Sequence, residues 1–201
     1  MPLRIAVCVS GGGSNLQALL ESLRTSDRAR VVLVLSNRAG VGGLARARAA
    51  DVPTAVLQDP ADSAEWLELL RRHQVDLIVL AGYLRLVPPA VIAANRDRII
   101  NIHPALLPAF GGPGMYGLRV HQAVIASGVK VSGCTVHLVD EVYDRGKILA
   151  QTRVPVLPGD SAESLAARVL EAEHRLLPAV VRAAAEAGRP IPIAQPVESE
   201  P

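Results

Sequence analysis

Residues 3–23 read LRIAVCVSGGGSNLQALLESL, and these letters contain a strand, a turn and a helix in direct succession. The apolar run over 3–10 is rich in β-branched residues, which is typical of a strand buried on both faces. Three glycines then turn the chain, and leucines follow at positions 16, 19, 20 and 23, which form one face of a helix. This unit decides the fold because the residues that follow repeat it.

Apolar runs and helical periodicity alternate through the first half of the chain. We expect further strands at 31–37, 54–58, 76–83 and 98–104, and helices at 15–23, 42–50 and 63–73. Apolar strands with helices between them imply a mainly parallel sheet that helices cover on both faces. The sequence therefore predicts an α/β fold with a Rossmann-like first half.

The pattern changes in the second half, where strand-like runs at 130–140 and 147–156 are joined by a polar stretch without a helix. Two such runs usually pair antiparallel, so we expect a mixed sheet that ends in a β-hairpin. A long helix should then begin near Asp160 or Ser161, either of which can cap its first turn. Pro178 should kink or restart this helix.

The composition fits one domain, because the 201 residues are half hydrophobic and can bury a sizeable core. We place this domain at residues 1–187 and expect a disordered, proline-rich tail at 188–201. Lysine and arginine number 21 against 19 acids and are scattered, which argues against a nucleic-acid partner. No run approaches the roughly 20 apolar residues of a membrane span, and no signal-peptide pattern is present. We therefore expect a cytoplasmic protein with no membrane association.

Cys8 and Cys134 lie in apolar, β-branched surroundings, so we expect two buried free thiols in a reducing compartment. They are too few for a disulfide framework and too poorly spaced for a zinc site. No neighbouring residue lowers the pKa of either thiol. We therefore expect neither a nucleophilic cysteine nor a bound metal.

The strand-like run IINIHPALLP at 99–108 carries two polar side chains that a buried strand does not need. Asn101 and His103 are two residues apart, so in a strand they point to the same face, just before Pro104 ends the run. A buried amide or imidazole costs free energy when it has no partner. One interpretation is that the pair merely caps the strand end, and the other, which we favour, is a catalytic site.

The glycine-rich turn SGGGSNLQ at 10–17 opens a helix, with Ser14 and Gln17 at the spacing of a capping box. Free amides at such a helix start form an anion site suited to a phosphate. A dinucleotide site would have glycine in place of Leu16 and an acid in place of Asn37, which weakens an NAD interpretation. A tight turn without a ligand explains the same letters equally well.

A second candidate region, SGCTVHLVDEVYDRGKIL at 132–149, is a strand followed by an acidic loop. Strand alternation places Thr135, His137 and Val139 on one face. A loop carboxylate that reached His103 would hold its ring in one tautomer and raise its pKa, which suits a group that accepts and then donates a proton. An ordinary solvated hairpin is the alternative for these loop acids, which are Asp140, Glu141 and Asp144.

The remaining histidines give weaker signals. His73 and His121 occur in polar helical contexts, and we expect both at the surface. His137 faces either the site or the core, and His174 packs beside Glu173 on the last helix.

Five motifs in fixed order give the chain a likeness to a known family: SGGGSNLQ, LAGYLRLV, NIHPALLP, SGCTVHLVDEVYDRGKIL and EAEH. They resemble the phosphoribosylglycinamide formyltransferases, which belong to the folate-dependent formyltransferases, and the likeness covers residues 3 to about 186. The resemblance implies transfer of a formyl group from 10-formyltetrahydrofolate, as co-substrate, to the amine of glycinamide ribonucleotide in purine synthesis. It implies small-molecule substrates and leaves open whether the chain is a monomer or a homodimer.

By matching motifs, the resemblance implies a catalytic trio of Asn101, His103 and Asp144. The residues that it assigns to the ribonucleotide substrate are Gly13, Ser14, Asn15 and Glu173. The residues that it assigns to the folate are Leu84, Arg85, Leu86, Val87, Asn101, Asp140, Glu141, Val142, Tyr143 and Asp144. No metal is implied.

Two other interpretations stay open. In the first, the chain is a different enzyme, either a 10-formyltetrahydrofolate hydrolase or a formyltransferase for another small amine. In the second, it is a non-catalytic module that binds a nucleotide or a folate. A substrate panel separates the enzymes, and replacement of Asn101 or His103 separates an enzyme from a binding module.

Overall fold

Seven strands form one sheet in the computed structural model of the chain, which describes residues 1–193. The strands are β1 (Leu3–Val9), β2 (Ala29–Ser36), β3 (Thr54–Val56), β4 (Leu77–Leu80), β5 (Ile99–His103), β6 (Val131–Leu138) and β7 (Ile148–Pro155). The helices are α1 (Ser14–Leu23), α2 (Gly42–Ala49), α3 (Ser63–Arg72), α4 (Pro89–Ala94), α5 (Leu118–Ser127) and α6 (Ala162–Ala187).

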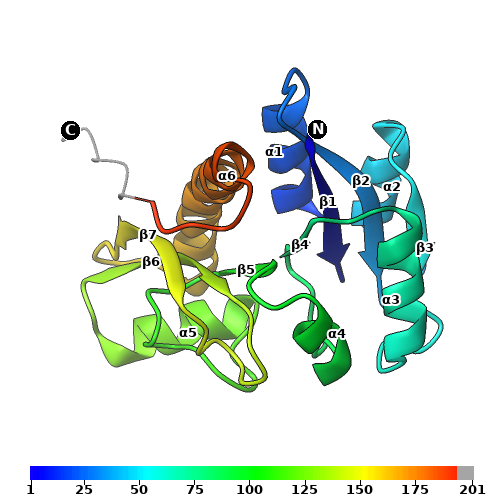
Figure 1. Ribbon diagram of the computed structural model, residues 1–201. Helices are drawn as coiled ribbons and strands as arrows, with labels where there is room; N and C mark the ends of the chain where they lie inside the picture. Colours follow the sequence, from blue (N-terminus) through cyan, green and yellow to red (C-terminus); the bar gives the residue numbers. More distant parts are fainter. Residues whose placement is uncertain (194–201) are drawn as a thin grey trace.

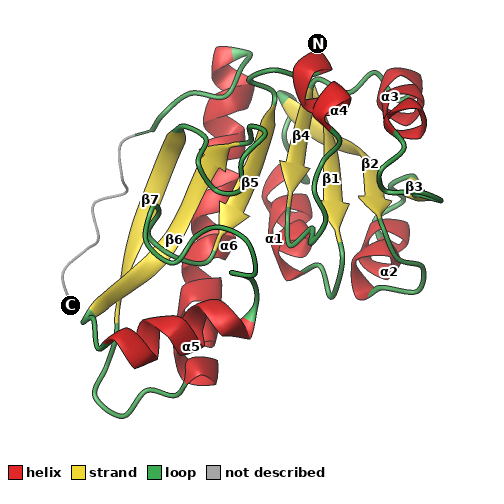
Figure 2. Cartoon of the chain, turned by 90° about the horizontal axis from the view of Figure 1, so that it is seen from below, coloured by secondary structure: helices red, strands yellow, loops and turns green. Residues whose placement is uncertain are grey.

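The strands lie in the order β3-β2-β1-β4-β5-β6-β7, which Figure 2 shows as one continuous row. The first five pair in parallel, whereas β6 pairs antiparallel with both β5 and β7. The central parallel strands β1 and β4 are apolar runs buried on both sides, as expected from the sequence, whereas the edge strand β3 is only partly buried. The predicted α/β class, with a mainly parallel mixed sheet and a terminal hairpin, is confirmed.

Two hydrophobic clusters hold helices on the two faces of the sheet (Figure 1). The larger cluster joins the sheet to α1, α2, α5 and the long α6. The smaller cluster joins the other face to α3 and α4, with Trp66 fully buried at its centre. The carboxyl ends of β1, β4 and β5 lie between the two layers of helices, and polar side chains are found at these strand ends.

The β6–β7 hairpin has two local features that place its connecting loop. The pairing register shifts between Val136 and His137, which is a β-bulge, and such bulges re-aim neighbouring side chains. Gly146 lies so close to the Leu138 carbonyl that a Cβ there would collide with it. Only glycine therefore closes the 139–147 loop in this way, and the closure brings Asp144 back toward the sheet.

The helices differ from the sequence prediction in three respects. Gly13 is the N-cap of α1 at φ 74° and no side chain caps the helix, so the capping box predicted for Ser14 and Gln17 is wrong. A glycine in the left-handed conformation makes this turn without a side-chain cap. The six-residue α4, which begins at Pro89, and the ten-residue α5 have no predicted range, although the sequence places His121 in a helical context. The long helix α6 continues through Pro178 and does not restart there.

Two other expectations, on the cap of α6 and on the two cysteines, are confirmed. Ser161 is the N-cap of α6 and its Oγ accepts from the Ser164 N–H at 3.2 Å. Cys8 and Cys134 are both free and buried, and burial raises the pKa of the Cys134 thiol to about 12. In the described part of the chain, none of the helices has the length and apolar character to cross a membrane.

The predicted tail begins after α6. The Ile193 N–H donates to the Leu149 carbonyl of β7 at 3.0 Å. Residues 194–201 of this tail lie outside the described residues, so their predicted disorder stays a prediction.

Candidate active site

Asn101 and His103 lie at the carboxyl end of β5 and point to one face of the sheet. The antiparallel register pairs Asn101 with His137 of β6, and His103 with Thr135. Directly paired residues share a face of the sheet, so the four polar side chains form a compact patch. Three of them are almost completely buried, because His103 is 3%, His137 2% and Thr135 0% exposed.

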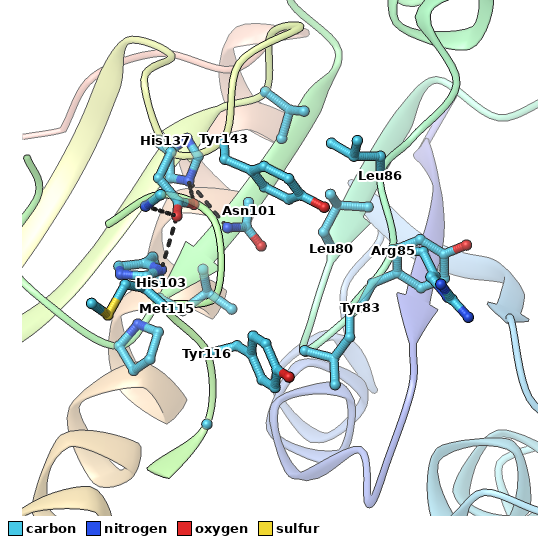
Figure 3. A pocket seen from close by; sticks show the side chains of 18 of the residues that line it. Leu80, Tyr83, Arg85, Leu86, Asn101, His103, Met115, Tyr116, His137 and Tyr143 are labelled. Atoms are coloured by element: carbon cyan, nitrogen blue, oxygen red, sulfur yellow. Dashed lines mark hydrogen bonds and ion pairs between the residues drawn. The ribbon is translucent and has the colours of Figure 1, made fainter. Parts of the chain in front are cut away.

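The loop between β6 and β7 brings Asp144 to this patch. Its backbone is left-handed at φ 56°, a conformation that aspartate tolerates better than most residues. Asp144 Oδ2 accepts from the Gly112 N–H at 2.9 Å and lies 3.6 Å from His103 Nδ1, while Oδ1 lies 3.5 Å from His137 Nε2. One carboxylate therefore stands between two imidazoles, which Figure 3 shows with dashed lines.

His103 has an oxygen acceptor near each ring nitrogen. Its Nε2 donates to the Phe110 carbonyl at 2.9 Å, and its Nδ1 faces Asp144. Burial lowers the pKa of His103 below its usual value, while Asp144 and the Phe110 carbonyl oppose this effect and His137 adds to it. The ring is thus neutral more readily than in water, but it has an acceptor in place for a second proton.

His137 fixes the orientation of the Asn101 amide. His137 Nδ1 lies 2.7 Å from the Leu138 carbonyl, which can only accept, so Nδ1 carries the proton. When Nε2 carries no proton it is an acceptor, and the Asn101 Nδ2 then donates to it at 3.1 Å. The second N–H of the amide is left to donate to a ligand.

Asp144 is the charged member of the group. Burial raises the pKa of its carboxyl, but the two imidazoles and the Gly112 N–H outweigh burial and lower the pKa overall. A carboxylate that stays ionised beside His103 stabilises the protonated ring. The arrangement can therefore hold a proton on His103 and release it again.

A cleft of about 440 Å3 opens onto these groups. Asn101, His103, His137 and Asp144 lie in its wall, and Figure 3 shows three of these side chains facing Leu86 and Arg85 across it. Its mouth carries apolar side chains that are between 40% and 55% exposed, namely Leu84, Leu86, Tyr116, Val142 and Tyr143. Exposed apolar side chains gathered at one cleft indicate a flat, partly apolar ligand.

Asn15 and Glu173 form a separate polar pair in the cleft wall. Asn15 Nδ2 donates to Glu173 Oε2 at 2.6 Å, and Asn15 Oδ1 is buried without a partner among the described residues. Burial raises the pKa of Glu173 to about 7, although the Asn15 amide acts in the opposite direction. An unpaired acceptor beside a carboxyl group suits a ligand that donates from hydroxyl or amine groups.

The structure brings most of the predicted site residues to this one cleft. The proposed catalytic trio lines it, as do Asn15 and Glu173, and so do these predicted folate residues: Leu84, Arg85, Leu86, Val87, Asp140, Val142 and Tyr143. Gly13, Ser14 and Glu141 do not line it. Gly13 and Ser14 instead form the start of α1, directly before Asn15.

One buried histidine and one segment that lines the cleft were not identified by the sequence analysis. His121 is 4% exposed and lines the cleft, so its predicted place at the surface is wrong. His121 lies next to Val120 and three residues before Val124, and both valines are fully buried. This helical spacing of apolar residues indicates that His121 belongs to the buried face of its helix. Residues 112–118, to which the sequence analysis assigns no role, supply much of one wall of the cleft. His73 is half-buried at the end of α3.

Within residues 1–193, no three histidine, cysteine or acidic side chains are arranged to hold a metal ion. The pair of imidazoles around Asp144 is instead a hydrogen-bonded group in which each ring nitrogen faces a protein atom.

The chain is similar to known enzymes over most of its length. The phosphoribosylglycinamide formyltransferase of Vigna unguiculata, described as chloroplastic, is 48% identical over 190 residues, which are 91% of this chain and 61% of that protein. The same enzyme of Arabidopsis thaliana is 46% identical and is covered to 65% of its length, against 91% of this chain. The chain thus spans less than two thirds of the length of these curated relatives.

Solved structures give the same picture. Phosphoribosylglycinamide formyltransferase from Anaplasma phagocytophilum superposes with a TM-score of 0.86 at 40% identity, over 93% of this chain and 88% of that one. A formyltetrahydrofolate deformylase from Pseudomonas syringae gives 0.83 at 28% identity, over 93% of this chain and 62% of that one. Residues 3–181 match the family described as formyl transferase. The chain belongs to the formyl transferase family.

Proposed function

We propose that this protein transfers the formyl group of 10-formyltetrahydrofolate to the amine of glycinamide ribonucleotide, a step of de novo purine biosynthesis. The observation that carries the proposal is the buried group of Asn101, His103 and Asp144 in the wall of the cleft. The names of the most similar relatives and solved structures support the choice of substrates.

The reaction needs two kinds of help that this group can supply. When the amine nitrogen attacks the formyl carbon, negative charge develops on the formyl oxygen, and the free N–H of Asn101 is a donor for it. The bond from carbon to N10 then breaks, and the proton lost by the amine must reach N10. His103 is the group that can carry this proton, once one of its ring nitrogens exchanges its protein partner for the substrate, and Asp144 stabilises the protonated ring. The products are the formylated amine and tetrahydrofolate.

The two ends of the cleft suit the two substrates. The apolar mouth formed by Leu84, Leu86, Val142 and Tyr143 fits the rings of the folate, with Arg85, Val87, Asp140 and Glu141 as further parts of these two segments. Asn15 and Glu173 offer acceptors to the hydroxyl groups of a ribose. The α1 start at Gly13 and Ser14 would bind the phosphate through backbone N–H groups.

The proposal includes the setting in which the protein acts. We infer a cytoplasmic enzyme, monomeric or homodimeric, that binds small molecules and neither nucleic acid nor a membrane, and that needs no metal. The near balance of 21 basic and 19 acidic residues supports the absence of a nucleic-acid partner. The plant relatives are described as chloroplastic, so a plastid is the alternative location.

A hydrolase is the second candidate, because one structural neighbour is a formyltetrahydrofolate deformylase. The two activities use the same donor but differ in the acceptor, which is water in one case and an amine in the other. A non-catalytic module is the third candidate, and it would consume no folate.

The test is a coupled absorbance assay of 10-formyltetrahydrofolate consumption, with and without glycinamide ribonucleotide. We expect turnover that depends on the nucleotide and falls about 10²–10³-fold in both Asn101→Ala and His103→Ala. His73→Ala is the matched control, because this histidine lies at the end of α3 and does not line the cleft. Folate consumption that needs no acceptor would favour the hydrolase, and folate binding without turnover would favour the binding module.

A further inference from the structure

The side chain of Gln151 makes contacts that the proposed reaction does not use directly. Gln151 lies on β7, the strand at the edge of the sheet, and no residue of β7 lines the cleft. The pairing register places it beside Thr135 of β6, and Thr135 beside His103 of β5. Because paired residues share a face of the sheet, the three side chains form one row across three strands.

Gln151 and Thr135 together hold a buried turn after β5. Gln151 Nε2 donates to the Leu107 carbonyl at 2.9 Å and to Thr135 Oγ1 at 3.0 Å. Thr135 Oγ1 donates to the Ala105 carbonyl at 2.6 Å and accepts from the Leu107 N–H at 3.0 Å. Buried backbone outside helices and strands must find its partners elsewhere, and these two side chains provide them for the Ala105–Leu107 turn.

The turn is in contact with the segment that holds Asp144. A Cβ added at Gly111 would lie 2.5 Å from Leu107 Cδ2 and 3.2 Å from Asp144 Cβ, so the Leu107 side chain packs tightly against this backbone. The next residue, Gly112, donates its N–H to Asp144 Oδ2 at 2.9 Å. A shift of Leu107 would therefore move the donor that fixes the carboxylate.

We propose that Gln151 is a positioning residue for the reaction: with Thr135 it holds the Ala105–Leu107 turn, and through this turn the Phe110 carbonyl and Gly112 N–H that orient His103 and Asp144. The inference rests on the proposed function, in which His103 moves a proton. Gln151 itself touches neither the cleft nor the imidazole.

Steady-state kinetics of Gln151→Met provide the first test, because methionine keeps the length of the side chain and removes its donor. We expect kcat to fall about 10–100-fold, with KM for both substrates unchanged, since small misplacements of a catalytic group have effects of this size. Arg153→Met is the matched control, because Arg153 is exposed two residues along the same strand and faces the same side. It should keep the kcat of the unmodified chain.

A titration of the His103 ring by NMR of ¹⁵N-labelled histidine provides the second test and needs no substrate. The groups that face this ring are Asp144, the Phe110 carbonyl, His137 and, from α5, His121. Asp144 and the Phe110 carbonyl raise the pKa of His103, so a looser turn in Gln151→Met should lower it, while Arg153→Met should not. A variant that only melts at a lower temperature, with kcat and the pKa of His103 unchanged, would overturn the proposal.

Thr135→Ser and Thr135→Val test the same turn if Gln151→Met does not fold. Serine keeps the hydroxyl and should keep kcat, whereas valine removes it and should lower both kcat and the pKa of His103. Identical behaviour of the two variants would count against the proposal. An inactive unmodified chain would refute the proposed function, and the titration would still decide whether Gln151 controls the His103 ring.

Discussion

Burial shifts the pKa values of Glu173 and His103 in opposite directions. Burial raises the pKa of Glu173 to about 7 and lowers the pKa of His103 below its usual value. In both cases the neutral form is favoured, because a buried charge loses its hydration. Asn15 opposes this effect at Glu173, and Asp144 opposes it at His103. Glu173 is therefore able to change its charge near neutral pH, whereas burial favours the neutral form of His103.

Glu173→Gln should remove one source of pH dependence from the free energy of unfolding. The folded state holds the Glu173 proton up to about pH 7, whereas the unfolded chain releases it near the ordinary value of 4.5. Between these values the folded state binds more protons, so its stability falls as the pH rises. The stability of the unmodified chain relative to Glu173→Gln should decrease by up to about 3 kcal/mol from pH 4 to 8. Urea unfolding at several pH values measures this difference, and a constant difference would contradict the account.

At the level of elements, two glycines fix how α1 and α2 meet the end of β1. A Cβ at Gly13 would lie 2.5 Å from Gly43 Cα, and a Cβ at Gly43 would lie 2.8 Å from Val9 Cγ2. The sequence predicts that the glycines before α1 let a ligand approach the backbone. The structure adds a second reason for Gly13, which is the close approach of another backbone.

Gly43→Ala should therefore destabilise the protein by about 1–3 kcal/mol, because the added methyl group collides with the buried Val9. Gly12→Ala is the control for stability, since a Cβ there meets nothing within 4 Å. Thermal and urea unfolding of the two variants provide the measurement. Equal free energies of unfolding for the two variants would show that the structure accommodates a methyl group between residue 43 and Val9 without cost.

The elements were predictable to different degrees for physical reasons. The parallel strands β1 and β2 are continuous apolar runs, so the sequence predicts them with nearly the observed bounds, whereas β4 is half as long as the predicted strand at 76–83. The short α4 begins at Pro89, directly after Pro88, and it contains too few residues to show a helical period. Pro178 does not end α6, because the apolar face of this helix is packed against the sheet along its length.

The candidate site was also predictable only in part, because local patterns reveal some of its residues and long-range contacts place the others. Asn101 and His103 were visible because polar residues interrupt an apolar strand, and strand geometry alone aligns them. The contact of His137 with Asn101 depends on the β5–β6 register, which no local pattern encodes. The contact of Asp144 with His103 depends on the closure of a nine-residue loop at 139–147, so the sequence predicted a carboxylate there without fixing its neighbours.

For the whole molecule, the strand order explains where the cleft lies. The chain moves outward from β1 through β2 to β3, then returns to place β4 and β5 on the other side of β1. Ligands of open α/β sheets bind beyond the carboxyl ends of the strands at such a reversal. Asn15 follows β1, the 82–87 segment follows β4, and Asn101 and His103 end β5, so all three line the cleft. The antiparallel β6 and β7 then add His137 and the loop with Asp144.

The measurement that tests the central claim most directly follows the formyl carbon itself. The unmodified protein is mixed with 10-[¹³C]formyltetrahydrofolate and glycinamide ribonucleotide, and the label is located by ¹³C NMR and mass spectrometry. The account predicts that the label appears on the amine of the ribonucleotide, in amounts that match the folate consumed, and that His103→Ala abolishes its appearance. Label found only in free formate, or left on the folate, would contradict it.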